Sequence, residues 1–220
     1  MFKEIFKLLG KDNLQVQALS ECYEMLDLSH QMVTASVETL RRRDDTEISV
    51  DLYELDKRVN SFERDVRRKV MTHLSLGHME DVASGLVLVS IVIDLERIGD
   101  YSKNIYDLAQ NHPKRLTGGP LAKDLDYIEK RALSNFSRAV EAFKSGDEHE
   151  GRKLMIDYKE GISAKCRELE QKLVTGEVQL DTAEAVATAL YMRFLKRISA
   201  HSRNLVSSIV NPFDRIGYPE

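Results

Sequence analysis

The sequence predicts an all-α protein built as two tandem three-helix bundles related by a pseudo-two-fold axis. The 220 residues include only four prolines and no tryptophan, and 31% of them are charged, which is typical of long amphipathic helices. Apolar residues recur at helical spacing over long stretches that end at glycine or proline. A shift of 100 residues also aligns five identities within eleven positions, so the chain is predicted to be a duplication. The repeated residues are Leu95, Arg97, Ile98, Ser102 and Asn104.

Residues 1–12 are predicted to be a short N-terminal amphipathic segment. Phe2, Ile5, Phe6 and Leu9 share one side of a helix that ends at Gly10. We expect this segment to pack against the bundle. Docking to a membrane surface or to a partner is the alternative.

The first half, residues 13–112, is predicted to fold as three helices. Asp12 and Gln15 resemble a capping box that opens the first helix, and Ser49 can cap the second. The third helix is about 32 residues long, or some 48 Å, and a helix of that length without a breaker indicates a bundle. The predicted helices span 14–40, 49–76 and 79–110.

Residues 113–119 are predicted to be a linker, because the stretch 111–120 holds two prolines and a pair of glycines. The second half, residues 120–212, is predicted to be another three-helix unit, followed by a tail at 213–220. Asp147 with Glu150, and Asp181 with Glu184, resemble capping boxes. The predicted helices span 120–144, 147–174 and 181–210.

Charge and cysteine content restrict the class of protein. A net charge of -4 gives no reason to expect nucleic acid as a partner, and Cys22 and Cys166 are too few for a disulfide framework. The chain shows no signal peptide, and its most apolar run, 86–93, is far shorter than the roughly 20 residues that span a bilayer. We therefore expect a cytoplasmic protein.

Four carboxylates of the first half are predicted to lie close together. The second and third helices run antiparallel about a tight turn, which brings Asp56, Glu63, Glu96 and Asp100 within roughly 10 Å along the bundle axis. Carboxylate oxygens suit hard ions such as Mg²⁺, Mn²⁺, Ca²⁺ or iron. The alternative is that arginines at 67 and 97 neutralise the carboxylates as solvated ion pairs.

Residues 94–105 read Asp-Leu-Glu-Arg-Ile-Gly-Asp-Tyr-Ser-Lys-Asn-Ile, and they resemble the signature of the PhoU family of phosphate-transport regulators. That signature is Glu-x-x-x-Asp inside Leu-Glu-Arg-Ile-Gly-Asp, followed by Asn-Ile. The resemblance implies a duplicated PhoU-like repeat whose acidic motifs can hold a divalent metal or iron. It points to Glu96 and Asp100 as the motif pair, with Asp56 and Glu63 as contributors from the second helix.

The second repeat departs from this pattern. Lys196 and Ala200 stand where the first repeat has Glu96 and Asp100, so we expect one metal site and not two. A cationic stripe takes its place on the last helix, where it is either a solvated basic face or a binding site for an acidic partner or an anion. The stripe consists of Arg193, Lys196 and Arg203.

By resemblance, the protein would be an adaptor that negatively regulates a phosphate transporter and its sensor histidine kinase. We expect a homodimer that reaches the membrane only through its partners. No nucleophile motif or metalloprotease motif is present, so we do not expect an enzyme. The alternatives are an accessory regulator of a sodium-phosphate symporter or a potassium channel, and a metal-dependent phosphohydrolase.

Overall fold

The computed structural model describes residues 13–112 and 114–219, and within these ranges the chain is helical and contains no strand. This confirms the predicted all-α fold. The predicted amphipathic segment at 1–12 lies outside the described residues. Six long helical segments are formed: α2 (Leu14–Arg42), α3 (Leu52–Ser75), α4 (Val82–Asn111), α5 (Ala122–Ser145), α6 (Glu148–Asp157) continued by a π-helical turn (Tyr158–Ser163) into α7 (Ala164–Val174), and α8 (Thr182–Val210).

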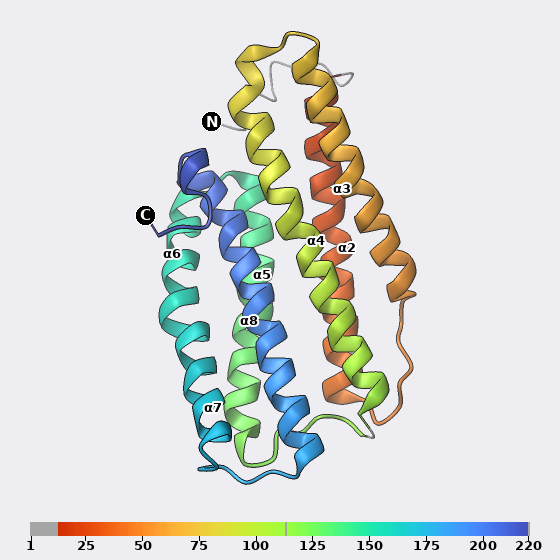
Figure 1. Cartoon of the computed structure of the whole chain (residues 1–220), viewed down its shortest axis with the longest axis vertical. Helices are drawn as coiled ribbons and strands as arrows, with labels where there is room; N and C mark the ends of the chain where they lie inside the picture. The colour runs from red at the N-terminus through yellow and green to blue at the C-terminus, as the bar shows by residue number, and fades with distance from the viewer. Residues whose placement is uncertain (1–12, 113, 220) are drawn as a thin grey trace.

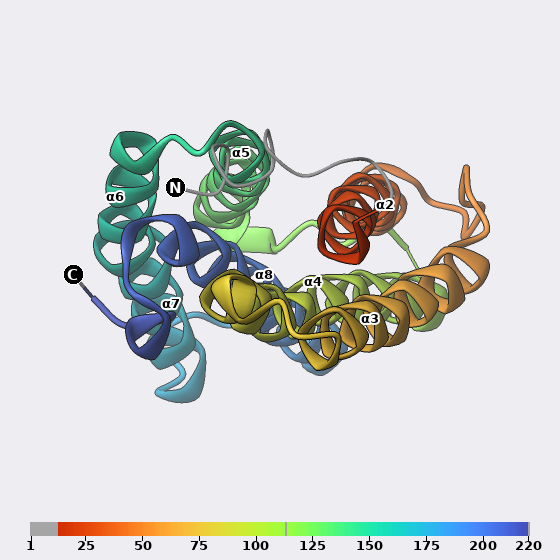
Figure 2. The same cartoon turned by 90° about the horizontal axis from the view of Figure 1, so that it is seen from above.

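The helices lie along the long axis of the molecule in two layers (Figures 1 and 2). Seen from above, α3, α4 and α8 form one layer, and α2 and α5 form the other. The α6–α7 segment lies beside α8 and packs against it. The two halves of the chain meet mainly where α4 packs against α8, with α2 also touching α5.

Side-chain caps begin most of these helices. The predictions at Asp147 and Asp181 are confirmed, since their carboxylates accept hydrogen bonds from the backbone N–H groups three residues later. The prediction of Ser49 as a cap is wrong, because Asp51 caps α3 by accepting from Glu54 N at 3.0 Å. Asn13 caps α2, whereas Asp12 lies outside the described residues. Ser49 and Asp51 are both of a type that caps helices, and they lie two residues apart. The sequence alone therefore does not show which of them is the cap.

The apolar core is continuous across both halves. Ile91 and Leu95 on α4 and Leu195 on α8 are fully buried and belong to one cluster that also includes α2, α3 and α5. The helices of the two repeats therefore bury their apolar faces against one another as well as within each repeat.

Contacts between α4 and α8 repeat at a shift of 100 residues. The Tyr101 ring lies 6.1 Å from the Phe194 ring, and the equivalent pair is His201 with Asp94, joined by a hydrogen bond of 2.7 Å. Tyr101 and His201 stack on each other at 5.8 Å. This reciprocal pattern is what a pseudo-two-fold axis between the two helices produces.

A buried ion pair also joins the halves. Arg41 on α2 donates from Nε to Glu129 on α5 at 2.8 Å, and the two side chains are 4% and 2% exposed. Tyr191 on α8 donates its hydroxyl to the same carboxylate at 2.9 Å. Burial raises the pKa of Tyr191 well above its ordinary value, so the phenol keeps the proton that it donates.

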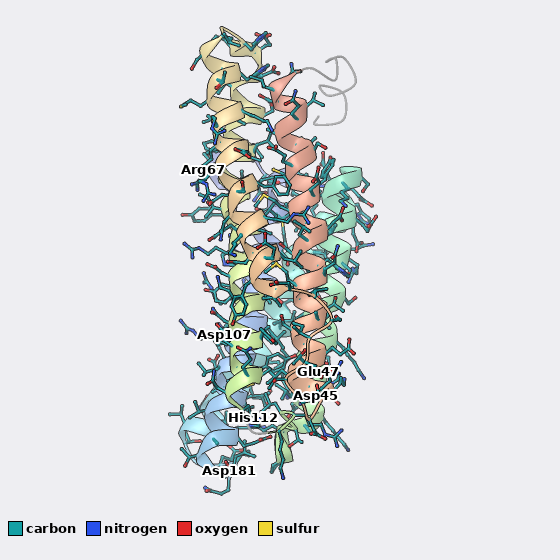
Figure 3. The ribbon with its side chains drawn as sticks, turned by 90° about the vertical axis from the view of Figure 1, so that its right-hand side faces the viewer. Asp45, Glu47, Arg67, Asp107, His112 and Asp181 are labelled. Carbon is teal, nitrogen blue, oxygen red and sulfur yellow. The ribbon has the colours of Figure 1, made fainter. Side chains whose placement is uncertain are left out.

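The segment after α4 is held against the start of α8. Glu184 accepts hydrogen bonds from the backbone N–H groups of Thr117 at 3.1 Å and Gly118 at 2.7 Å. Gly118 has φ 78°, a left-handed conformation that favours glycine. Figure 3 shows that His112 and Asp181 lie at one end of the molecule, near the loop that carries Asp45 and Glu47. None of the described helices combines the length and apolar character needed to cross a bilayer.

Candidate functional site between α3 and α4

The four predicted acidic residues line the contact between α3 and α4. Val59 and Val66 bury the core side of α3, and the positions three residues before each, Asp56 and Glu63, lie at the edge facing α4. Asp56 and Glu63 have side chains that are 13% and 16% exposed. We call this set, with Glu96 and Asp100 on α4, the acidic seam.

Lys103 on α4 joins the two helices across the acidic seam. Its Nζ lies 2.8 Å from Oδ2 of Asp56 and 3.4 Å from Oδ1 of Asp100. Asn60 on α3 donates to the same Oδ2 of Asp56 at 3.2 Å. The ammonium group of Lys103 therefore bridges Asp56 and Asp100.

Two arginines also form ion pairs with carboxylates of the acidic seam. Arg97 lies 2.9 Å from Asp100 and 3.4 Å from Glu96. Arg67, labelled on α3 in Figure 3, lies 2.8 Å from Glu63 on the next turn of its own helix. These are the ion pairs expected when arginines neutralise the acidic residues.

Burial and neighbouring charges shift the pKa values of Glu96 and Lys103. Burial, followed by the charge of Asp100, raises the pKa of Glu96; Arg97 opposes this, and Glu63 and Asp56 add to it. Burial disfavours the charged form of Lys103, but the hydrogen bond to Asp56 and the charges of Asp56 and Asp100 outweigh it and raise the pKa of this lysine. Lys103 is therefore a permanent cation at neutral pH.

The arrangement does not fit a metal centre. The donor chemistry suits a hard ion, because every candidate ligand is a carboxylate oxygen. However, within residues 13–112 and 114–219 no three histidine, cysteine or acidic side chains are placed to hold a metal together. The chain's own cations occupy the carboxylates instead. Metal binding at Glu96, Asp100, Asp56 and Glu63 stays a prediction from the sequence, and the ion pairs around these residues argue against it.

The three residues of the predicted cationic stripe on α8 have different surroundings in the structure. Lys196 lies 3.8 Å from Glu170 on α7. Arg203 donates to the backbone oxygen of Gly217 at 2.6 Å and lies over the Tyr158 ring. Arg193 is exposed and forms no ion pair with any described residue. Of the three, Arg193 is the one that the structure leaves open to an acidic partner.

Sequence reasoning did not single out Lys103, although it had a local signal. Lys103 follows Asp100 by three residues and Glu96 by seven, which places all three on one face of a helix. The Asp94–His201 hydrogen bond had no comparable signal, because its partners are 107 residues apart.

Comparison with known proteins relates this geometry to a family. Residues 22–109 match the family model described as the PhoU domain. The chain carries a PhoU domain. The matched range of the PhoU domain contains all of α3, nearly all of α4 and the whole acidic seam. No curated protein matches the chain by sequence.

Two solved structures share the fold over 89% of this chain. The crystal structure of PhoU from Pseudomonas aeruginosa superposes with a TM-score of 0.75 at 21% identity, covering 89% of this chain and 95% of that one. The phosphate transport system regulatory protein PhoU from Streptococcus pneumoniae gives a TM-score of 0.70 at 16% identity, covering 89% and 94%. The fold of these PhoU structures therefore extends over both halves, beyond the PhoU domain at 22–109.

Proposed function

We propose that this protein is a PhoU-type regulator of phosphate transport that works as an adaptor. The match of residues 22–109 to the PhoU domain carries the proposal. The similarity of the whole chain to two PhoU structures supports it, because both halves are then available as docking surface.

In its specific form, the proposal is that the protein damps a phosphate transporter and its sensor histidine kinase when phosphate is plentiful. It acts from the cytoplasmic side and reaches the membrane through these partners. A regulator of this kind needs a rigid surface with a defined charge pattern, and it needs no reacting groups.

The layer of α3, α4 and α8 is the surface best suited to docking. No other described helix lies over its outer face (Figure 2). This layer carries the acidic seam and Arg97, whose side chain is 51% exposed. Its helix α8 also carries the exposed Arg193, which forms no ion pair with a described residue. Charges of both signs at fixed positions favour selection among partners and their orientation more than raw affinity.

Affinity capture from phosphate-replete cells tests the choice of partner. A tagged chain, cross-linked in the cell, should retain phosphate-transporter subunits and a sensor histidine kinase. Retention of a sodium-phosphate symporter or a potassium channel in their place would favour the alternative that the chain regulates another transporter. Recovery of none of these membrane proteins would contradict the proposal.

A metal-dependent phosphohydrolase is the alternative from a different class. It would use the acidic seam as a two-metal site, and the pairing of those carboxylates with Lys103, Arg97 and Arg67 opposes this. We expect no turnover of simple phosphate esters with Mn²⁺ or Fe²⁺. Turnover that is lost in Asp100→Asn would favour the hydrolase.

We also propose that the protein forms a homodimer, because long bundles leave elongated faces for contacts between identical surfaces. Light scattering at micromolar concentration should give twice the mass of one chain. A mass of one chain would contradict this part of the proposal.

A further inference from the structure

The position of Lys103 has a consequence for metal binding. Its ammonium group contacts carboxylate oxygens from both α3 and α4, and its side chain is only 26% exposed. Hard metal ions bind carboxylate oxygens at roughly 2.0 to 2.6 Å. An ion that bridged these same oxygens of Asp56 and Asp100 would overlap the ammonium group and would be repelled by its charge. The two cations therefore exclude each other.

Further polar groups of the chain contact the acidic seam. Arg97 contacts the second oxygen of Asp100, and Asn60 shares the Asp56 oxygen that Lys103 uses. Three cationic side chains face the four carboxylates, so most of the charge that would attract a metal is already neutralised.

The second repeat offers an independent comparison. Arg203 lies 100 residues after Lys103, so a cation occupies the same position of both repeats. Arg203 lies over the ring of Tyr158, 5.0 Å from its centroid, and so joins α8 to the π-helical turn after α6. The second repeat has lost the carboxylates at 196 and 200 but has kept this cation. The shared role of the position is to attach the third helix of a repeat to the second.

We propose that Lys103 is the resident cation of the acidic seam, where it joins α3 to α4 and excludes a hard metal ion. The wild-type protein is then a metal-free bundle, and a metal site becomes available only when the ammonium group is removed. The inference does not rest on the proposed function, because it concerns the purified protein alone.

The test compares metal binding by the wild type and Lys103→Met, which keeps most of the length of the side chain and removes its charge. Equilibrium dialysis and thermal melts with chelator or Mn²⁺ supply two readouts. We expect Lys103→Met to bind Mn²⁺ about 10- to 100-fold more tightly than the wild type, the range by which neighbouring groups change metal affinity. Mn²⁺ should raise the melting temperature of the variant and leave that of the wild type unchanged.

Three further variants serve as controls for this comparison. Lys103→Arg keeps a cation and should bind no more Mn²⁺ than the wild type. Asp100→Asn added to Lys103→Met should abolish the gain. Lys57→Met is the matched control, because Lys57 is an exposed lysine of α3 that pairs with Glu54 outside the acidic seam.

Two outcomes would overturn the proposal. One is a wild-type protein that binds one Mn²⁺ per chain as tightly as Lys103→Met. The other is a folded Lys103→Met that gains no affinity. If Lys103→Met does not fold, Lys103→Gln takes its place with the same two outcomes, since its shorter amide also removes the charge.

Discussion

Ionisation of Glu96, in the acidic seam, is disfavoured in the folded protein. Burial and the charge of Asp100 raise its pKa in the folded protein. The protonated form is therefore favoured by folding, and its contribution to stability is present at acid pH and is lost as the pH rises through the raised pKa. A side chain that is neutral at every pH should keep its contribution to stability as the pH rises.

Glu96→Gln is accordingly expected to raise the melting temperature at neutral pH, with a gain that shrinks as the pH falls from about 8 to about 4. Thermal melts across this range measure the difference from the wild type. Glu54→Gln is the control, because Glu54 is an exposed carboxylate outside the acidic seam that pairs with Lys57. A variant less stable than the wild type at neutral pH would contradict the prediction.

At this scale, the spacing of single residues predicted which acidic side chains lie close together, but it did not predict the contact of Lys103 with Asp56. Glu96 and Asp100 are one helical turn apart, so their shared face follows from the period of a helix. Arg67 and Arg97 were available as neutralising partners from the same reasoning. That Lys103 reaches α3 depends on the rotation of α4 against α3, which the packing of the whole core sets.

At the scale of elements, the contact between the 114–118 segment and α8 depends on one carboxylate. Glu184 accepts from two backbone N–H groups and from the Thr117 hydroxyl at 2.9 Å. Glu184→Ala should destabilise the protein by about 1 to 2 kcal/mol, because these donors lose their acceptor in a half-buried position. Urea unfolding measures the change.

Glu141→Ala is the control for Glu184→Ala, because Glu141 is an exposed glutamate of α5. It should stay within about 0.5 kcal/mol of the wild type. Equal effects of the two substitutions would mean that the Glu184 contact contributes nothing to stability.

The helix predicted over 147–174 could be predicted only in part from the sequence. Its start at Asp147 follows from capping chemistry, but the π-helical turn at Tyr158–Ser163 does not. A Cβ on Gly161 would lie 2.7 Å from Nε of Arg131, so the glycine admits the arginine that pairs with Asp157. That fit involves α5, and no local pattern in the sequence describes it.

At the scale of the whole molecule, the Arg41–Glu129 pair ties the first half to the second. Arg41→Met should cost about 3 to 5 kcal/mol, because the buried Glu129 carboxylate then keeps only the half-exposed Arg42 as a cationic partner. Arg43→Met, at an exposed pair with Asp45, should cost much less, because exposed ion pairs contribute little to stability. Chemical denaturation that gives equal costs for both would contradict the role of the buried pair.

The five identities at a shift of 100 residues indicated the duplication. The duplication in turn predicted the pseudo-two-fold relation of the halves. It did not predict that the two repeats share one core. That sharing depends on α4 and α8 being buried against each other, with Ile91 and Leu195 both fully enclosed. A helix shows from its sequence how wide its apolar face is, but not which partner covers that face.

We propose that the chain restrains phosphate uptake through other proteins. The most direct measurement is uptake of labelled phosphate by phosphate-replete cells that lack this chain, with the wild-type chain restored as the reference. Uptake should rise when the chain is absent and return to normal when it is restored. Uptake that stays the same in the presence and absence of the chain would contradict it.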